Sequence, residues 1–231
     1  MAKTITSQEA ALDGRQSSTI FIPELARDIL EQIVFEARKS EFVDVKSGVS
    51  ARLSITAFEN LVSTAERRLL HSGDDKTGIR MSDFIGIIPA ITGKIELVYE
   101  GEQEGAYSVA LTLLGGAIKT LYSKYFPKIE KLEKQGVETP YDEIVSWFFN
   151  TSDDFEILDD VQEKDYKIIL GKVKPLSDFI KKFKEDLQPN EVYFWQEFVL
   201  WSLVEYKKLN KYRYAEGIQF KDPYGSFISG L

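Results

Sequence analysis

The sequence predicts an all-α protein, in which a small helical bundle is followed by a C-terminal helical domain. In several segments apolar residues recur three and four positions apart, as they do on one face of an amphipathic helix. No segment shows the sustained alternation of apolar and polar residues that is typical of a half-buried strand. Apolar residues make up 43% and aromatic residues 13% of the 231 residues, so the chain can bury a substantial core.

The first predicted unit is a helical bundle over residues 20–98, preceded by a polar arm or linker over residues 1–19. Pro23 marks the start of its first helix, which fades at residues 38–40. A long second helix runs to His71. The apolar face of this second helix is expected to consist of Phe58, Leu61, Val62, Ala65 and Leu69.

A third helix is expected to complete the bundle. After a turn over residues 72–78, a short extended piece is predicted at Ile79–Met81, and Ser82 is a candidate N-cap. Pro89 would kink or interrupt the helix, and Gly93 is expected to end it.

The second predicted unit covers residues 99–231 and follows a change of composition at residues 94–105. The Gly115–Gly116 pair costs its first helix about 2 kcal/mol relative to two alanines, which a close crossing of two helices would explain. Residues 211–231 are expected to be irregular. The helices of this unit are predicted at residues 106–125, 141–149, 163–170, 176–187 and 190–209.

One arginine, Arg52, stands at the start of the long second helix. Gly48 suits a turn because glycine adopts positive φ at little cost, and Ser50 is a candidate N-cap. A capping box at Thr56 and Glu59 is an alternative start one turn later. A cation in the first helical turn is unfavourable unless an anion lies opposite, so Arg52 is a candidate phosphate-binding residue. The alternative is a surface arginine or an arginine–carboxylate pair.

Composition excludes several classes of function. A net charge of −8 argues against a nucleic-acid partner. Without cysteine there are no disulfides, thiol catalysis or cysteine-based zinc sites. With a single histidine, His71, Ser-His-Asp chemistry and multi-histidine metal sites are nearly excluded. Three acidic clusters lack EF-hand spacing and are interpreted as solvated surface, so no metal site is predicted. They lie at Asp153–Asp154, Asp159–Asp160 and Glu100–Glu104.

The sequence also argues against a membrane protein. The N-terminal segment has no apolar core of a signal peptide. The aromatic run at Val192–Val204 is broken by Gln196 and Glu197 and is too short to cross a bilayer. A soluble, cytoplasmic protein is expected, with this run either packed inside the protein or forming an exposed groove for a partner.

The order of these elements resembles the C-terminal part of MoxR-like and magnesium-chelatase I-subunit-like AAA+ ATPases. The segments that carry the resemblance are Gly48–Arg52, Ile79–Met81, the helix that begins at Ser82, and Pro89–Ala106. Residues from Ile20 to about Leu97 look like the α-helical lid of those enzymes, and the remainder resembles the helical extension of one bacterial branch. The resemblance implies that Arg52 is the sensor-2 arginine, which reaches the γ-phosphate side of bound ATP, with Gly48 and Ser50 supporting its turn.

The nucleotide-binding core of that family is missing from this sequence. Gly93–Lys94 and Gly171–Lys172 both fail the Walker A pattern, and no apolar strand leads into an Asp–Glu pair that would hold magnesium. The chain is therefore not expected to be an enzyme on its own, and ATP and Mg²⁺ are expected only with a separate or upstream ATPase core. It is either a C-terminal fragment of a longer ATPase or a stand-alone remnant, and the residues near Ile5 favour the fragment.

The resemblance also implies partners. It indicates ATP-dependent, chaperone-like remodelling of a protein, with the AAA+ core, neighbouring ring subunits and a protein with a von Willebrand A-type domain as partners. Magnesium insertion into a porphyrin is not implied. The alternative, from a different class, is a stand-alone helical protein–protein interaction module without a nucleotide role.

Overall fold

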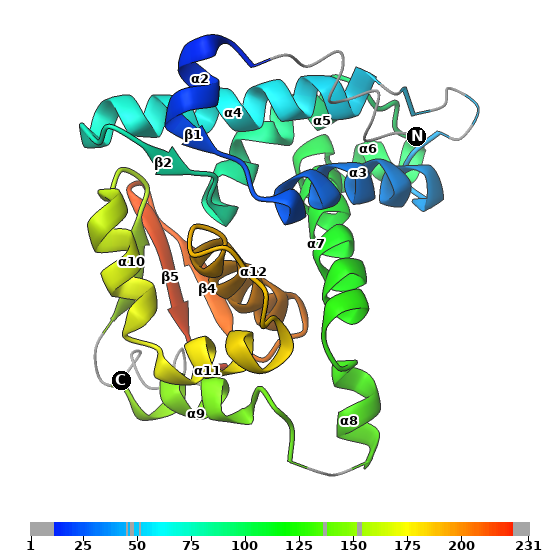
Figure 1. Cartoon of the computed structure of the whole chain (residues 1–231). Coiled ribbons are helices and arrows are strands. Elements are labelled where there is room, and N and C mark those ends of the chain that lie inside the picture. Colours follow the sequence, from blue (N-terminus) through cyan, green and yellow to red (C-terminus); the bar gives the residue numbers. More distant parts are fainter. Residues whose placement is uncertain are drawn as a thin grey trace.

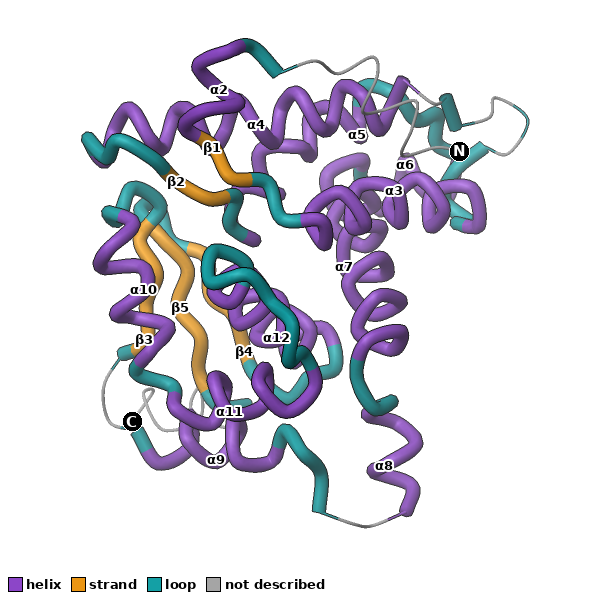
Figure 2. Tube along the Cα trace, viewed as in Figure 1, coloured by secondary structure: helices purple, strands orange, loops and turns teal. Residues whose placement is uncertain are grey.

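The computed structural model describes residues 12–44, 46, 49–50, 52–135, 138–151 and 154–223. Helices predominate in this part of the chain, as the sequence predicts (Figure 1). The same residues also form one two-stranded and one three-stranded sheet, so the expectation that the fold is all-α is wrong (Figure 2). The N-terminal helices form one layer, and α7 runs from that layer along one side of the C-terminal half (Figure 1).

Helices α3 (Glu24–Lys39) and α4 (Arg52–Ser72) are the main helices of the N-terminal half. The start of α3 directly after Pro23 and its end at Lys39 confirm the sequence prediction. The five apolar positions expected on one face of α4 are all buried. The apolar positions predicted from the sequence therefore form the buried face of α4.

The third predicted helix is divided in two. Residues Met81–Ile87 form a 3-10 helix, η1, and α5 (Ile88–Thr92) follows with Pro89 in its first turn and Gly93 as its C-cap. Proline is favoured in the first turn of a helix because its missing N–H has no intrahelical acceptor there. Pro89 therefore starts a new helix instead of kinking an existing one.

Part of the predicted N-terminal arm is ordered against α4. Helix α2 (Gly14–Thr19) begins with a capping box between Asp13 and Gln16, and Gln16 Nε2 donates to Glu66 Oε2 of α4 at 3.0 Å. Strand β1 (Ile20–Phe21) then pairs in parallel with β2 (Thr77–Gly78). The extended piece expected at residues 79–81 thus lies two residues upstream.

Helix α7 (Ala106–Tyr125) joins the two halves and has the bounds that the sequence predicts; α6 (Tyr99–Glu104) precedes it. A Cβ atom at Gly115 would lie 2.4 Å from Glu205 Oε2, and one at Gly116 would lie 3.5 Å from the Glu36 side chain of α3. Gly115 therefore allows a close approach of the Glu205 side chain of α12, whereas a Cβ atom at Gly116 would make an ordinary van der Waals contact. Buried residues on both sides of the expected boundary at residues 94–105 belong to one continuous core.

The C-terminal half contains the helices predicted at residues 141–149, 163–170, 176–187 and 190–209, with somewhat different bounds, and a sheet that was not predicted. The helices are α8 (Ile129–Gln135), α9 (Asp142–Asn150), α10 (Glu163–Gly171), α11 (Lys174–Phe183) and α12 (Val192–Glu205). The antiparallel sheet has the order β3-β5-β4, from β3 (Phe155–Leu158), β5 (Gly217–Lys221) and β4 (Asn210–Arg213). Residues 210–221 therefore form a hairpin where irregular structure was expected.

Helix α12 lies at the centre of this half. Its side chains from Phe194 to Leu203 are buried, and it packs against α7, α10, α11 and η1. This confirms that the aromatic run is part of the core. An exposed groove formed by this run, the alternative, is wrong.

A lysine from the hairpin closes over α12. Lys211 Nζ lies 3.3 Å from the centroid of the Trp201 ring, a cation–π contact. Burial lowers the pKa of Lys211 to about 8, although the Glu205 and Glu197 carboxylates oppose this shift. The folded chain thus releases the Lys211 proton at a lower pH than the unfolded chain does.

The free energy of unfolding should therefore depend on pH through Lys211. Between about pH 8 and the ordinary lysine value of 10.5, the unfolded chain binds more protons, so the Lys211 contribution to stability rises with pH. Urea unfolding of the wild type and of Lys211→Met across this window measures it, because groups common to both proteins cancel. A difference between the two proteins that stays constant with pH would contradict the lowered pKa.

Candidate functional site

The arginine singled out by the sequence is the first residue of α4, and its side chain is exposed. Its backbone N–H donates to Ser50 Oγ at 3.1 Å, and the N–H of Leu53 donates to the Ser50 carbonyl at 3.0 Å. Ser50 thus caps this end of the helix. The alternative start at Thr56 is wrong, because α4 begins four residues earlier. Gly48 lies outside the described residues.

The surroundings of Arg52 contain a second arginine. Arg38, in the last turn of α3, donates from Nη2 to the Val49 carbonyl at 3.4 Å and ties that helix to the segment before α4. Within the described part of the chain, no carboxylate forms an ion pair with Arg52. The described residues therefore show no arginine–carboxylate pair at Arg52.

At the opposite end of α4, Arg68 is the centre of a buried polar network. Its Nε and Nη2 donate to the two carboxylate oxygens of Asp83 at 3.2 and 2.8 Å, and Nη2 also donates to the Gly78 carbonyl at 2.8 Å. Its Nη1 donates to Thr77 Oγ1. Burial alone would lower the pKa of Arg68, but the charge and hydrogen bonds of Asp83 raise it. Arg68 therefore fixes β2 and η1 to α4.

A second buried arginine, Arg80, connects the network to the C-terminal half. Arg80 is 1% exposed, and its guanidinium lies 4.1 Å above the Tyr166 ring of α10. Its Nη2 donates to Glu163 Oε2 at 3.3 Å, while Nε and Nη1 have no partner among the described residues. Glu163 also accepts from Thr77 Oγ1 at 3.2 Å and pairs with Lys167 Nζ at 3.3 Å.

The carboxylate of Glu197 on α12 completes the network. It accepts hydrogen bonds from the backbone N–H groups of Met81 at 2.9 Å and Ser82 at 3.2 Å. It also accepts from Tyr166 Oη at 2.7 Å. Burial raises the pKa of both Glu197 and Tyr166. Glu197 therefore satisfies the orphan donors at the start of η1, the role that the sequence assigned to Ser82.

We call Arg68, Arg80, Asp83, Glu163, Tyr166 and Glu197 the junction network. Most of its members are buried, and Glu163 is 22% exposed at the edge of the network. The effect of the network is to hold β2 and η1 against α10 and α12. Sequence patterns did not find it, because its members are far apart in the chain. One signal was present: an ionisable Glu197 inside an aromatic run must have buried partners.

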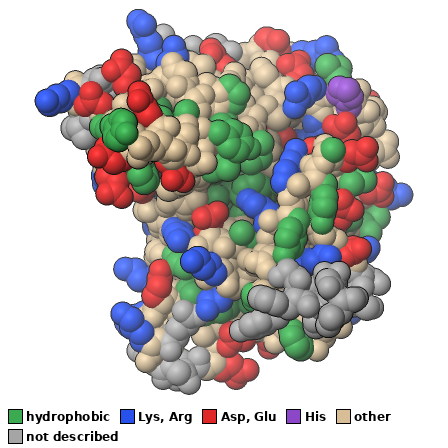
Figure 3. Space-filling view, turned by 180° about the vertical axis from the view of Figure 1, so that it is seen from behind, with side chains coloured by type: hydrophobic (Ala, Val, Ile, Leu, Met, Phe, Trp, Pro, Cys, Tyr) green, Lys and Arg blue, Asp and Glu red, His purple; other side chains and the backbone are tan. Residues whose placement is uncertain are grey.

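The remaining candidates lie at the surface. His71 is exposed, with Nδ1 3.9 Å from Asp160 Oδ2, and is the one histidine visible in Figure 3. Asp159 forms two hydrogen bonds with Arg213, at 2.7 and 2.6 Å. Among the described residues no group of three or more histidine or acidic side chains is arranged to hold a metal ion.

The part of the chain that the structure describes contains no helix with the length and apolar character needed to cross a membrane. The comparisons with known proteins add no assignment. No protein-family model, curated protein or solved structure matches this chain.

Proposed function

We propose that the chain is the lid and C-terminal module of a MoxR-like or magnesium-chelatase-like AAA+ ATPase. In this proposal Arg52 contacts the phosphates of ATP, which is bound with Mg²⁺ by a separate or upstream core. The observation that carries it is an exposed arginine without a described carboxylate partner, on the first turn of a capped 21-residue helix. A helix N-terminus and a guanidinium both favour a phosphate oxygen.

The rest of α4 holds Arg52 on a rigid element. At 1.5 Å per residue the helix is about 30 Å long, and the junction network fixes its far end through Arg68. Arg38 attaches the segment before α4 to α3. A side chain on such a rigid element can report on a bound phosphate without reordering the lid. The ATPase core, neighbouring ring subunits and a von Willebrand A-type protein are the proposed partners.

The test is Arg52→Ala in a protein that includes the ATPase core. ATP hydrolysis should fall at least about tenfold, because one charged hydrogen bond to phosphate is lost. Thermal stability should change little, because an exposed side chain contributes under about 0.5 kcal/mol. Arg67→Ala, an exposed arginine on the same helix, is the matched control and should leave hydrolysis unchanged. The chain without the core should not hydrolyse ATP.

Two results would overturn this proposal. Unchanged hydrolysis in the Arg52→Ala protein would leave a helical interaction module as the better description. A large fall in melting temperature would show that Arg52 has a structural role instead.

A further inference from the structure

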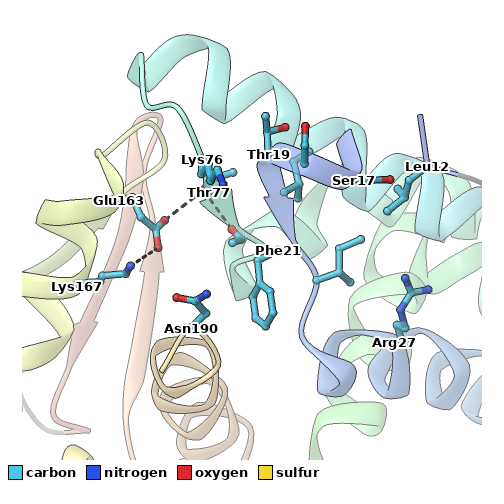
Figure 4. A pocket seen from close by; sticks show the side chains of 14 residues that line it. Leu12, Ser17, Thr19, Phe21, Arg27, Lys76, Thr77, Glu163, Lys167 and Asn190 are labelled. Carbon is cyan, nitrogen blue, oxygen red and sulfur yellow. Dashed lines mark hydrogen bonds and ion pairs between the residues drawn. The ribbon is translucent and has the colours of Figure 1, made fainter. Parts of the chain in front are cut away.

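A cleft lies at the junction of the two halves, away from Arg52. Its volume is about 460 Å³, and it is bounded by the α2–β1 segment, β2, α10 and the residues before α12. Figure 4 shows Lys76, Glu163 and Lys167 grouped on one side of this cleft, with Arg27 on the other. Arg68, which lies beside β2, is 16 residues from Arg52, or about 24 Å along the helix. The cleft and the Arg52 surface are therefore separate.

The charges that line the cleft are mostly positive, in a protein whose net charge is −8. Arg27, Lys76 and Lys167 face one acidic lining residue, Glu163. The Glu163 carboxylate already pairs with Lys167 and with the buried Arg80, each at 3.3 Å. An anion entering the cleft would therefore meet a wall whose acidic group is neutralised.

The buried Arg80 adds a further cation close to the cleft. Two of its guanidinium nitrogens have no described partner, so Glu163 satisfies it only in part. Lys76 is exposed and forms no ion pair with any described acidic residue. Two donors of Arg80 therefore remain unsatisfied on the buried side of Glu163, and the Lys76 ammonium has no described ion-pair partner on the open side.

The uncharged groups of the cleft define the ligand further. The hydroxyls of Ser17, Thr19 and Thr77 and the amide of Asn190 line it, together with the ring of Phe21. The Thr77 and Thr19 hydroxyls already donate to Glu163 and to the Arg15 carbonyl. Ammonium groups are good donors to phosphate oxygens, and the volume suits a small organic molecule. We infer that this cleft binds a small phosphate-bearing anion between Lys76 of the N-terminal half and Lys167 of the C-terminal half.

Calorimetric titration with sodium pyrophosphate at low ionic strength tests this inference on the whole chain. Binding with a sub-millimolar Kd is expected. Lys76→Ala and Lys167→Ala should each weaken it about five- to tenfold, because each removes one charged donor to phosphate. Lys164→Ala, an exposed lysine on α10 outside the cleft, is the matched control and should not change the Kd. Melting temperatures of all variants establish that they are folded.

Several outcomes would overturn the inference. These are no binding of pyrophosphate, equal weakening in the Lys164→Ala control, or unchanged binding in both cleft variants. Equally tight binding of citrate would overturn the assignment to phosphate. Arg52→Ala separates the two proposals, since pyrophosphate binding that is lost only in this variant would place the anion at α4 and not in the cleft.

Discussion

Replacing Glu197 with alanine is expected to lower the free energy of unfolding by about 3–5 kcal/mol. The carboxylate accepts from two backbone N–H groups of η1 and from Tyr166 Oη. Without it two buried donors and the part-buried N–H of Ser82 lose their acceptor, and each unsatisfied buried donor costs about 1–3 kcal/mol. Relief from burying the carboxylate itself offsets part of this loss.

Urea unfolding of two further variants makes the Glu197 test specific. Glu197→Gln keeps the shape and one acceptor oxygen, so it should lose about 1–2 kcal/mol. Glu185→Ala removes an exposed glutamate and should lie within about 0.5 kcal/mol of the wild type. A loss below about 1 kcal/mol for Glu197→Ala would mean that η1 and Tyr166 find other acceptors, and that the junction network does not depend on this carboxylate.

Trp201→Ala is expected to destabilise the protein by about 3–5 kcal/mol through the cavity that it leaves. The side chain is 1% exposed on α12, and its ring lies under Lys211. Truncation therefore removes a large apolar contact and also the cation–π contact of a half-buried lysine. Trp201→Phe keeps most of the volume and should cost about half as much.

Tryptophan fluorescence gives an independent measurement. The three tryptophans are Trp147, Trp195 and Trp201, and the last two are buried. The emission of a Trp147→Phe variant should be blue-shifted and resistant to soluble quenchers, because only the two buried tryptophans remain. Red-shifted emission in this variant, or a loss below about 1 kcal/mol for Trp201→Ala, would show that α12 does not form the core.

The sequence predicted best the elements that depend on local signals. Helix α7 lies between Gly105, which adopts a φ of 91°, and Pro127, so both ends are set by neighbouring residues. Strands β1, β2 and β3 depend on pairing with distant segments, since Ile20 pairs with Thr77 and Phe155 with Phe220. Strand β5 is also buried at four of its five positions and so lacks the alternating pattern of a half-exposed strand.

The same distinction between local and long-range signals applies to the Arg52 site and to the junction network. Arg52 and Ser50 could be found from the sequence because a helix start is a local pattern, and the structure places them together at the start of α4. The junction network could not, because Glu197 becomes a neighbour of η1 only when α12 packs against it. Charge patterns in the sequence do not encode such pairings.

The contact between Glu197 and Met81 has a consequence for how the protein forms during synthesis. The two residues are 116 positions apart, so the donors at the start of η1 have no acceptor on Glu197 until 116 further residues have been synthesised. Contacts between residues so distant in sequence slow folding, because a long loop must close first. The start of η1 therefore gains this acceptor only after α12 has been synthesised.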